Sequence, residues 1–281
     1  MKFGIREICD VVLKTKAANT KIGNKNFEKA GTPVIYFDSL KTSTMEGAAT
    51  TVYAQGGKGN ARLVAWEGER TVTFTMEDAL ISELGIAILT GAGLMNPTES
   101  KPIYVHSTAR AAIGEDKSAT VNLNTDEDVL AEDYAIWAIE LDANDNVLDT
   151  VEITTKKLSH TATKDGAAAV MFDFYLKKTG GATQITITAD KFAGNYYLEA
   201  STLFRGQDGV DRPAEFVIPN AKIQSNFTFT MASSGDPSTF TFTMDAFPDY
   251  TKFDPTEKVF CSIQVIEETA PLADKVEEVQ D

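Results

Sequence analysis

The sequence predicts a mainly β fold of antiparallel strands with one convincing helix. Three observations support this: apolar and polar residues alternate in many segments, these segments are rich in threonine and aromatic residues, and helical periodicity is scarce. β-Branched and aromatic side chains fit the pleated, half-buried surface of a strand. The clearest alternation runs over 71–76, 184–188, 227–231 and 240–244, where threonine recurs at alternate positions.

The segments 227–231 and 240–244 are predicted to form a β-hairpin. Residues 232–238 between them include Gly235, Asp236 and Pro237, which favour a turn. The two Phe-Thr-Phe-Thr-Met faces would then lie opposite each other. Further strands are expected at 7–15, 33–37, 61–66, 103–109, 135–141, 147–154, 170–176, 196–204, 215–218 and 259–266.

A helix is expected over 76–89, with a short second one at 189–192. Glu77 and Asp78 suit a helix N-terminus because negative charge there interacts favourably with the helix dipole. Gly91, just after the last apolar position, is a typical helix stop.

Residues 41–60 are predicted to form a long loop, because small residues dominate this stretch between two strands. Structureless segments of this length in compact domains are usually functional or disordered, and this one lacks the charge density of disorder. Composition also changes near 96–102 and 177–182. We therefore expect a discontinuous core of 1–102 and 177–268, an inserted β-rich module over 103–176, and an acidic flexible tail over 269–281.

The composition excludes several classes of protein. With 281 residues the chain can bury a large core without covalent staples. It has 41 acidic against 26 basic side chains and a formal charge of -15, which argues against binding nucleic acid through phosphate contacts. Cys9 and Cys261 lie far apart in the sequence and are predicted to be buried free thiols.

The N-terminus predicts an intracellular origin. Arg6, Glu7 and Asp10 interrupt the apolar stretch that a signal peptide needs, and no run is long enough to span a bilayer. The chain is therefore expected to be synthesised and kept in a cytosol, without contact with a membrane.

The sequence offers no catalytic constellation, so the chain is predicted not to be an enzyme. His106 and His160 have no nucleophile nearby in the sequence and are expected to be surface or cap histidines. The glycine-rich residues 56–60 lack P-loop spacing and are interpreted as a loop tip. Glu67 and Glu69 would share one side of a strand, which is typical of an acidic surface face.

Two further polar stretches are predicted to be hairpin turns. Residues 142–146 imitate the start of a calcium loop, but Val147 replaces the required glycine and Ile153 the bidentate glutamate. Asp208 and Gly209 also favour a turn between strands. No metal or cofactor is expected.

Particular stretches of the chain point to a family. Residues 42–57 read TSTMEGAATTVYAQGG and residues 60–69 read NARLVAWEGE. Residues 187–197 read ITADKFAGNYY, residues 216–223 read FVIPNAKI, and the Phe-Thr-Phe-Thr-Met pair follows. Together with their surroundings these stretches span well over half the chain, and they resemble major tail tube proteins of large tailed bacteriophages.

The resemblance implies a virion protein of the tail, made in the host bacterial cytoplasm. Its core would be an antiparallel β-sandwich or half-barrel with one flanking α-helix, and the inserted module 103–176 would project outward. Six copies would close a ring, and stacked rings would form a channel that conducts genomic DNA during ejection without binding it specifically. Besides further copies of itself, its partners would include sheath, tape-measure and baseplate proteins.

In this family an extended loop reaches the neighbouring ring, and residues 41–60 occupy the corresponding place. The resemblance therefore gives a candidate set of inter-ring contact residues on this loop: Thr44, Met45, Glu46, Thr51, Tyr53, Gln55 and Lys58.

Two other functions remain open. A capsid decoration protein, or another head protein, would share the β-rich texture but bind a preformed lattice. A carbohydrate-binding module would use exposed aromatic rings such as Trp137 or Tyr197 as stacking platforms, although burial of both residues is the favoured interpretation.

Overall fold

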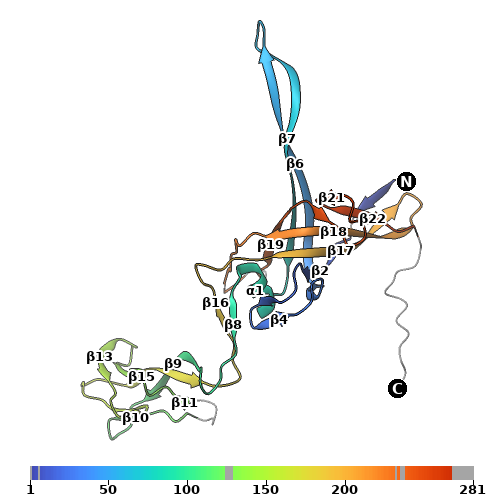
Figure 1. Ribbon diagram of the computed structural model, residues 1–281. Helices are drawn as coiled ribbons and strands as arrows, with labels where there is room; N and C mark the ends of the chain where they lie inside the picture. The colour runs from blue at the N-terminus through green and yellow to red at the C-terminus, as the bar shows by residue number, and fades with distance from the viewer. Residues whose placement is uncertain (1, 6, 124–128, 232, 235–237, 268–281) are drawn as a thin grey trace, which may run out of the picture. The chain divides into compact units, whose positions relative to one another are not determined.

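The computed structural model describes residues 2–5, 7–123, 129–231, 233–234 and 238–267, so the predicted acidic tail over 269–281 lies outside the described residues. The fold is mainly β and its strand pairs are antiparallel, which confirms the predicted fold class (Figure 1). The chain divides into two compact units. Unit 1 is Met1–Leu94 with Ile185–Asp281, and unit 2 is Met95–Gln184.

The elements of unit 1 come from both ends of the chain. They are β1 (Phe3–Ile5), β2 (Asp10–Thr15), β3 (Thr20–Ile22), β4 (Lys25–Phe27), β5 (Pro33–Phe37), β6 (Leu40–Gly56), β7 (Ala61–Asp78), α1 (Glu83–Thr90), β17 (Asn195–Gly206), β18 (Asp211–Ile223), β19 (Phe240–Ala246), β20 (Asp249–Tyr250), β21 (Lys258–Val259) and β22 (Ser262–Val265).

The strands of unit 2 are contiguous in sequence. They are β9 (Ile103–Ala112), β10 (Ser118–Thr120), β11 (Val129–Leu130), β12 (Trp137–Leu141), β13 (Val147–Glu152), β14 (Ser159–Thr161) and β15 (Ala169–Lys178). The two segments that join the units, β8 (Gly93–Met95) and β16 (Gln184–Thr186), pair with each other. The module expected over 103–176 lies within unit 2.

A nine-stranded sheet organises unit 1. Its strands run in the order β5-β2-β17-β18-β19-β7-β6, with β1 pairing to β17 and β22 to β18. Alternation places one face of each strand in a common core, so that Leu13, Leu198, Ile218 and Phe242 are completely buried. The helix α1 adds Ile88 and its neighbours to the same core.

The segment 41–60 is not a long loop, and that prediction was wrong. Residues 41–56 belong to β6, which pairs with β7 from Leu40↔Asp78 to Gly56↔Ala61 and forms a long hairpin closed by a turn at 57–60 (Figure 1). Thr50, Thr51, Val52 and Tyr53 have good strand propensity, and β7 supplies the ladder hydrogen bonds that the small residues around them need.

The hairpin predicted between 227–231 and 240–244 is also wrong. No strand forms over 227–231, whereas β19 pairs with β7 along Phe240–Ala246 and with the end of β18. Gln224 continues the ladder with one bond, its N–H donating to the carbonyl of Thr243 at 2.8 Å. Alternation shows that a segment can be a strand, but competition among neighbours decides its partner.

The predicted helix begins seven residues later than expected. Residues 76–78 form the end of β7 and are not helical. The helix α1 starts at Glu83 because the hydroxyl of Ser82 caps it, accepting a hydrogen bond from the N–H of Gly85 at 3.0 Å. The predicted stop at Gly91 is confirmed, with φ of 70°. The expected second helix at 189–192 does not form.

Unit 2 is built around a five-stranded sheet and a core of its own. Its strands run β11-β15-β12-β13, and β9 pairs with β15. Ala138, Val170, Phe172 and Phe174 are buried on one face. The turn predicted at 142–146 is confirmed: it joins β12 to β13, and Asp142 accepts from the N–H groups of residues 144 and 146.

The other predicted local features are largely confirmed. The turn at Asp208 and Gly209 joins β17 to β18, and Gly209 has φ of 80°. Both cysteines are free thiols; Cys9 is buried and Cys261 is half-buried. Burial raises the pKa of Cys261 to about 11, which keeps this thiol protonated and unreactive near neutral pH.

Candidate assembly surface

The most exposed part of unit 1 is the outer half of the β6–β7 hairpin. Near its base, Phe74 and Met76 of β7 are buried in the core. From Thr71 outward every side chain of β7 is exposed, as are those of β6 between Glu46 and Tyr53. Because the two antiparallel strands pair with each other and water can satisfy their outward-facing backbone groups, the hairpin can leave the sheet without a third strand.

The hairpin closes in a turn that its sequence specifies. Gly57, Gly59 and Asn60 have φ of 78°, 86° and 51°, and the N–H of Asn60 donates to the carbonyl of Gly57 at 3.2 Å. Glycine and asparagine adopt these left-handed conformations at low cost. The interpretation of 56–60 as a loop tip is therefore confirmed.

Large apolar side chains lie exposed on this outer half. Val52, Leu63, Val64 and Trp66 are 60%, 67%, 49% and 55% exposed. Sequence reasoning did not select them as contact residues. The signal was the unbroken apolar run 63–66, which puts apolar side chains on both faces of a strand and is typical of a strand covered on both sides.

The structure separates the seven predicted contact residues into two groups. Thr44, Met45 and Glu46 lie near the base, where Met45 packs against the core of unit 1. The other members lie in the outer half and are exposed: Thr51, Tyr53 and Gln55 on β6, and Lys58 in the turn.

Charges of both signs line the same hairpin. Glu67 and Glu69 are exposed, as the surface interpretation predicted. Arg62 lies over the ring of Tyr53, with its guanidinium carbon 4.1 Å from the ring centroid. This cation–π contact orders two side chains of the outer half without burying them.

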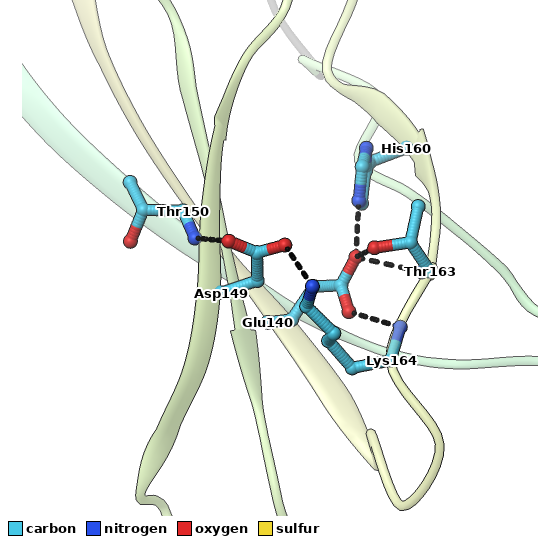
Figure 2. Close-up of polar contacts among 6 residues, drawn as sticks. All are labelled: Glu140, Asp149, Thr150, His160, Thr163 and Lys164. Atoms are coloured by element: carbon cyan, nitrogen blue, oxygen red, sulfur yellow. Dashed lines mark hydrogen bonds and ion pairs between the residues drawn. The ribbon is translucent and has the colours of Figure 1, made fainter.

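Unit 2 contains a polar cluster around a buried carboxylate, which is considered as a second candidate site (Figure 2). Glu140 of β12 is completely buried. Its Oε1 lies 2.8 Å from His160 Nε2 and accepts from the N–H of Thr163 at 2.8 Å and from its hydroxyl at 3.1 Å. Its Oε2 accepts from the N–H of Lys164 at 2.9 Å.

These partners keep Glu140 ionised. Burial acts to raise the pKa of Glu140, but the hydrogen bonds from His160, Thr163 and Lys164 outweigh it and lower the pKa to about 2. The Lys164 ammonium also lies 3.0 Å from Asp149 on β13 (Figure 2). The cluster thus connects residues 160–164 to the strands β12 and β13. Both carboxylate oxygens of Glu140 already accept hydrogen bonds, so the role of the cluster is structural.

His160 therefore departs from its prediction as a surface or cap residue. Its side chain is only 11% exposed because it partners the buried Glu140. His106 does lie at the surface, at 2.8 Å from Asp173.

The two aromatic residues weighed as sugar platforms differ. Tyr197 is buried, as predicted, whereas Trp137 is 40% exposed and its predicted burial is wrong. Trp137 is the first residue of β12 and pairs with Asp173 and Glu152 on its neighbours, which leaves its ring on an uncovered face of the sheet.

A model of the YomU/Tube protein family matches residues 5–257 of this chain. The chain belongs to the YomU/Tube protein family. This is a family of phage tail tube proteins, so the resemblance drawn from residues 42–69 and 187–223 is confirmed. A search of curated proteins finds no significant match.

Membership of the YomU/Tube family gives the exposed hairpin its context. A tail tube protein is a structural protein of the virion tail that assembles with copies of itself. The match includes the whole of β6 and β7 as well as unit 2. Both the hairpin and the inserted unit therefore lie within the part of the chain that the family model matches.

Two other kinds of site are absent from the described part of this tube protein. It contains no group of three or more His, Cys, Asp and Glu residues that could hold a metal ion. Within the same residues no helix has the length and apolar character needed to cross a membrane.

Proposed function

We propose that six copies of this protein close into a ring, and that rings stack into a tube that conducts genomic DNA during ejection. The observation that carries the proposal is the hairpin β6–β7, whose outer half projects from a large sheet with apolar residues exposed. An isolated subunit gains nothing from this exposure, whereas a neighbouring subunit can cover it.

The edges of the nine-stranded sheet support closure of a ring. β5 and β6 lie at the two ends of the strand order, and each has one strand partner among the described residues. Free edges of a long sheet invite pairing with another chain. Pairing the β5 edge of one copy with the β6 edge of the next would repeat around a closed ring and leave neither edge exposed.

The hairpin supports stacking of one ring on another. Thr51, Tyr53, Gln55 and Lys58 are assigned to the inter-ring contact because they lie in the exposed outer half. Thr44 and Glu46 would contact the neighbouring ring from the base, while Met45 acts there by holding β6 to the core.

The charge of the chain supports a channel that DNA traverses without binding. A formal charge of -15 repels a polyanion, so a wall that carries part of this charge would not retain DNA. The assembled tube would lie in the virion tail, in contact with sheath, tape-measure and baseplate proteins, after synthesis in the host cytoplasm.

Negative-stain electron microscopy of the purified protein tests the proposal. Rings with six subunits and stacked tubes are the expected result. Strictly monomeric particles across protein concentration and salt would refute it. Mixing the protein with empty capsids tests the alternative role, because a capsid decoration protein would bind the capsid lattice and leave no tubes.

A further inference from the structure

The outer hairpin carries one continuous apolar face, here called the tip patch. Val52 pairs with Trp66 and Ala54 with Val64 across the two strands. Directly opposed residues of an antiparallel pair point to the same face, and so do alternate residues of one strand. These four side chains therefore lie together, and the three large ones are about half exposed or more.

Unit 1 also contains an apolar hollow of about 420 Å³, here called the base groove. Its apolar lining includes Phe3, Ile5, Phe204, Phe216 and Ile263, and Glu7 lies at the same site. Phe3 stacks on Phe204 with ring centroids 4.7 Å apart, yet Phe3, Ile5 and Ile263 remain 46%, 62% and 51% exposed. Partly covered apolar walls of this kind are suited to an inserted apolar side chain.

A chain cannot place its own tip patch in its own base groove. Thr44 of β6 lines the groove, and Val52 of the tip patch follows eight residues later on the same strand. At the rise of an extended strand, the two points are about 26 Å apart. The hairpin would have to break its ladder to fold back, so the occupant must come from another molecule.

Charge favours a second copy of this chain as that occupant. Glu7 contributes a carboxylate to the groove, whereas Lys58 lies in the turn next to the tip patch. Apolar surfaces and opposite charges therefore match between the two ends of one hairpin.

We propose that the tip patch of one copy inserts into the base groove of another copy, with Lys58 next to Glu7. This inference rests on the proposed function and names the surface that receives the hairpin. The contact is heterologous, because it joins two different surfaces of the chain, and such contacts propagate into rings or open assemblies instead of stopping at a dimer.

Disulfide trapping between two variants tests this contact. Both variants carry Cys9→Ala and Cys261→Ala; one adds Ile5→Cys in the groove and the other adds Val64→Cys in the tip patch. After mixing, assembly and mild oxidation, a disulfide-linked heterodimer is expected. Pairing Val64→Cys with Leu80→Cys, a residue that is 71% exposed and outside the groove, is the control and should give less than about a tenth of that product.

Microscopy of the same samples separates the two proposals. Tubes that show no Ile5–Val64 disulfide would overturn the groove assignment and leave the tube function standing. Equal cross-linking of Val64→Cys with itself, or with the control, would also overturn it. A failure of the parent protein to form rings or tubes under any condition would refute the proposed function itself.

Charge reversal provides a second test that needs no cysteine. Glu7→Lys is expected to raise the protein concentration needed for assembly about tenfold, and adding Lys58→Glu should restore assembly. A double variant that assembles no better than Glu7→Lys would contradict the charge contact. Circular dichroism establishes that each variant is folded.

Discussion

Glu140 shows how one buried carboxylate can hold a loop in place. Among the described residues, the hydrogen bonds to its carboxylate come from residues 160–164, so the charge that its burial makes costly also holds that segment to β12. Replacing Glu140 with glutamine puts an amide donor against N–H donors. We expect Glu140→Gln to lower the free energy of unfolding of unit 2 by about 2–4 kcal/mol, measured by urea denaturation. Glu115→Gln, at an exposed position of the same unit, is the control and should change it little.

The same residue predicts a dependence on pH. The pKa of Glu140 in the folded protein, about 2, lies below its ordinary value of 4.5, so the folded state is favoured by ionisation. Its contribution to stability is complete above about pH 4.5 and is lost as the pH falls towards 2. The melting temperature of unit 2 should therefore fall over this range, and the fall should be smaller in Glu140→Gln. Equal falls in both proteins would contradict the assignment.

Gly91 is required by two local constraints at the end of α1. Its φ is 70°, and an added Cβ would lie 2.6 Å from the backbone carbonyl of Phe192. We expect Gly91→Ala to destabilise unit 1 by about 2–3 kcal/mol in urea denaturation, since backbone cannot move aside as a flexible side chain can. Gly93→Ala is the matched control, because a Cβ there meets nothing within 4 Å. Similar losses from both variants would refute this explanation.

At this scale the sequence predicted what depends on local conformation. The stop at Gly91 and the turns at 142–146 and 208–209 need only the preferences of glycine, asparagine and aspartate. The pairing of His160 with Glu140 could not be predicted, because it joins residues twenty positions apart through a tertiary contact. The exposure of Trp137 was missed for the same reason: it depends on which face of the sheet is covered.

Among the elements, the β6–β7 hairpin makes the sharpest prediction. Replacing residues 50–69 with Asn-Gly joins Ala49 to Arg70, which already face each other in the ladder, through a turn that suits a two-residue hairpin. The core residues Met45, Phe74 and Met76 are untouched. We therefore expect a folded protein with nearly unchanged urea stability that forms no tubes in electron micrographs.

Tubes of normal length from that shortened protein would contradict the role of the hairpin. A deletion that begins at Thr44 is a poor test by comparison, because it removes Met45 from the core. Loss of assembly in that case would report damage to the fold as well as to the contact surface.

The hairpin also shows which secondary-structure elements could not be predicted from the sequence. Strands with clear alternation, such as 71–76 and 240–244, are predicted correctly, because one buried face leaves a period of two. The sequence predicts a loop over 41–60 because small residues on both faces of a strand leave no period of two. The segment 227–231 has the period without forming a strand, so the period alone does not establish the ladder hydrogen bonds that define one.

For the molecule as a whole, charge governs association. Copies that carry a formal charge of -15 repel one another, and salt screens this repulsion over about 10 Å at 0.1 M. We expect the protein concentration needed for tube formation to fall several-fold between about 0.05 and 0.5 M NaCl, measured by sedimentation of polymer. A requirement that rises with salt would indicate that attraction between opposite charges dominates instead.

The length of the β6–β7 hairpin has a further consequence for the assembled tube. If its tip docks on another copy, the number of residues between base and tip sets the distance by which the joined copies are offset. Two residues added to each strand keep every side chain on its original face and lengthen the hairpin by about 7 Å. One residue added to each strand would turn the apolar face of the tip away from its receptor. The repeat distance along the tube would thus depend on the length of this one strand pair, and docking would depend on whether residues are added to each strand in even or odd numbers.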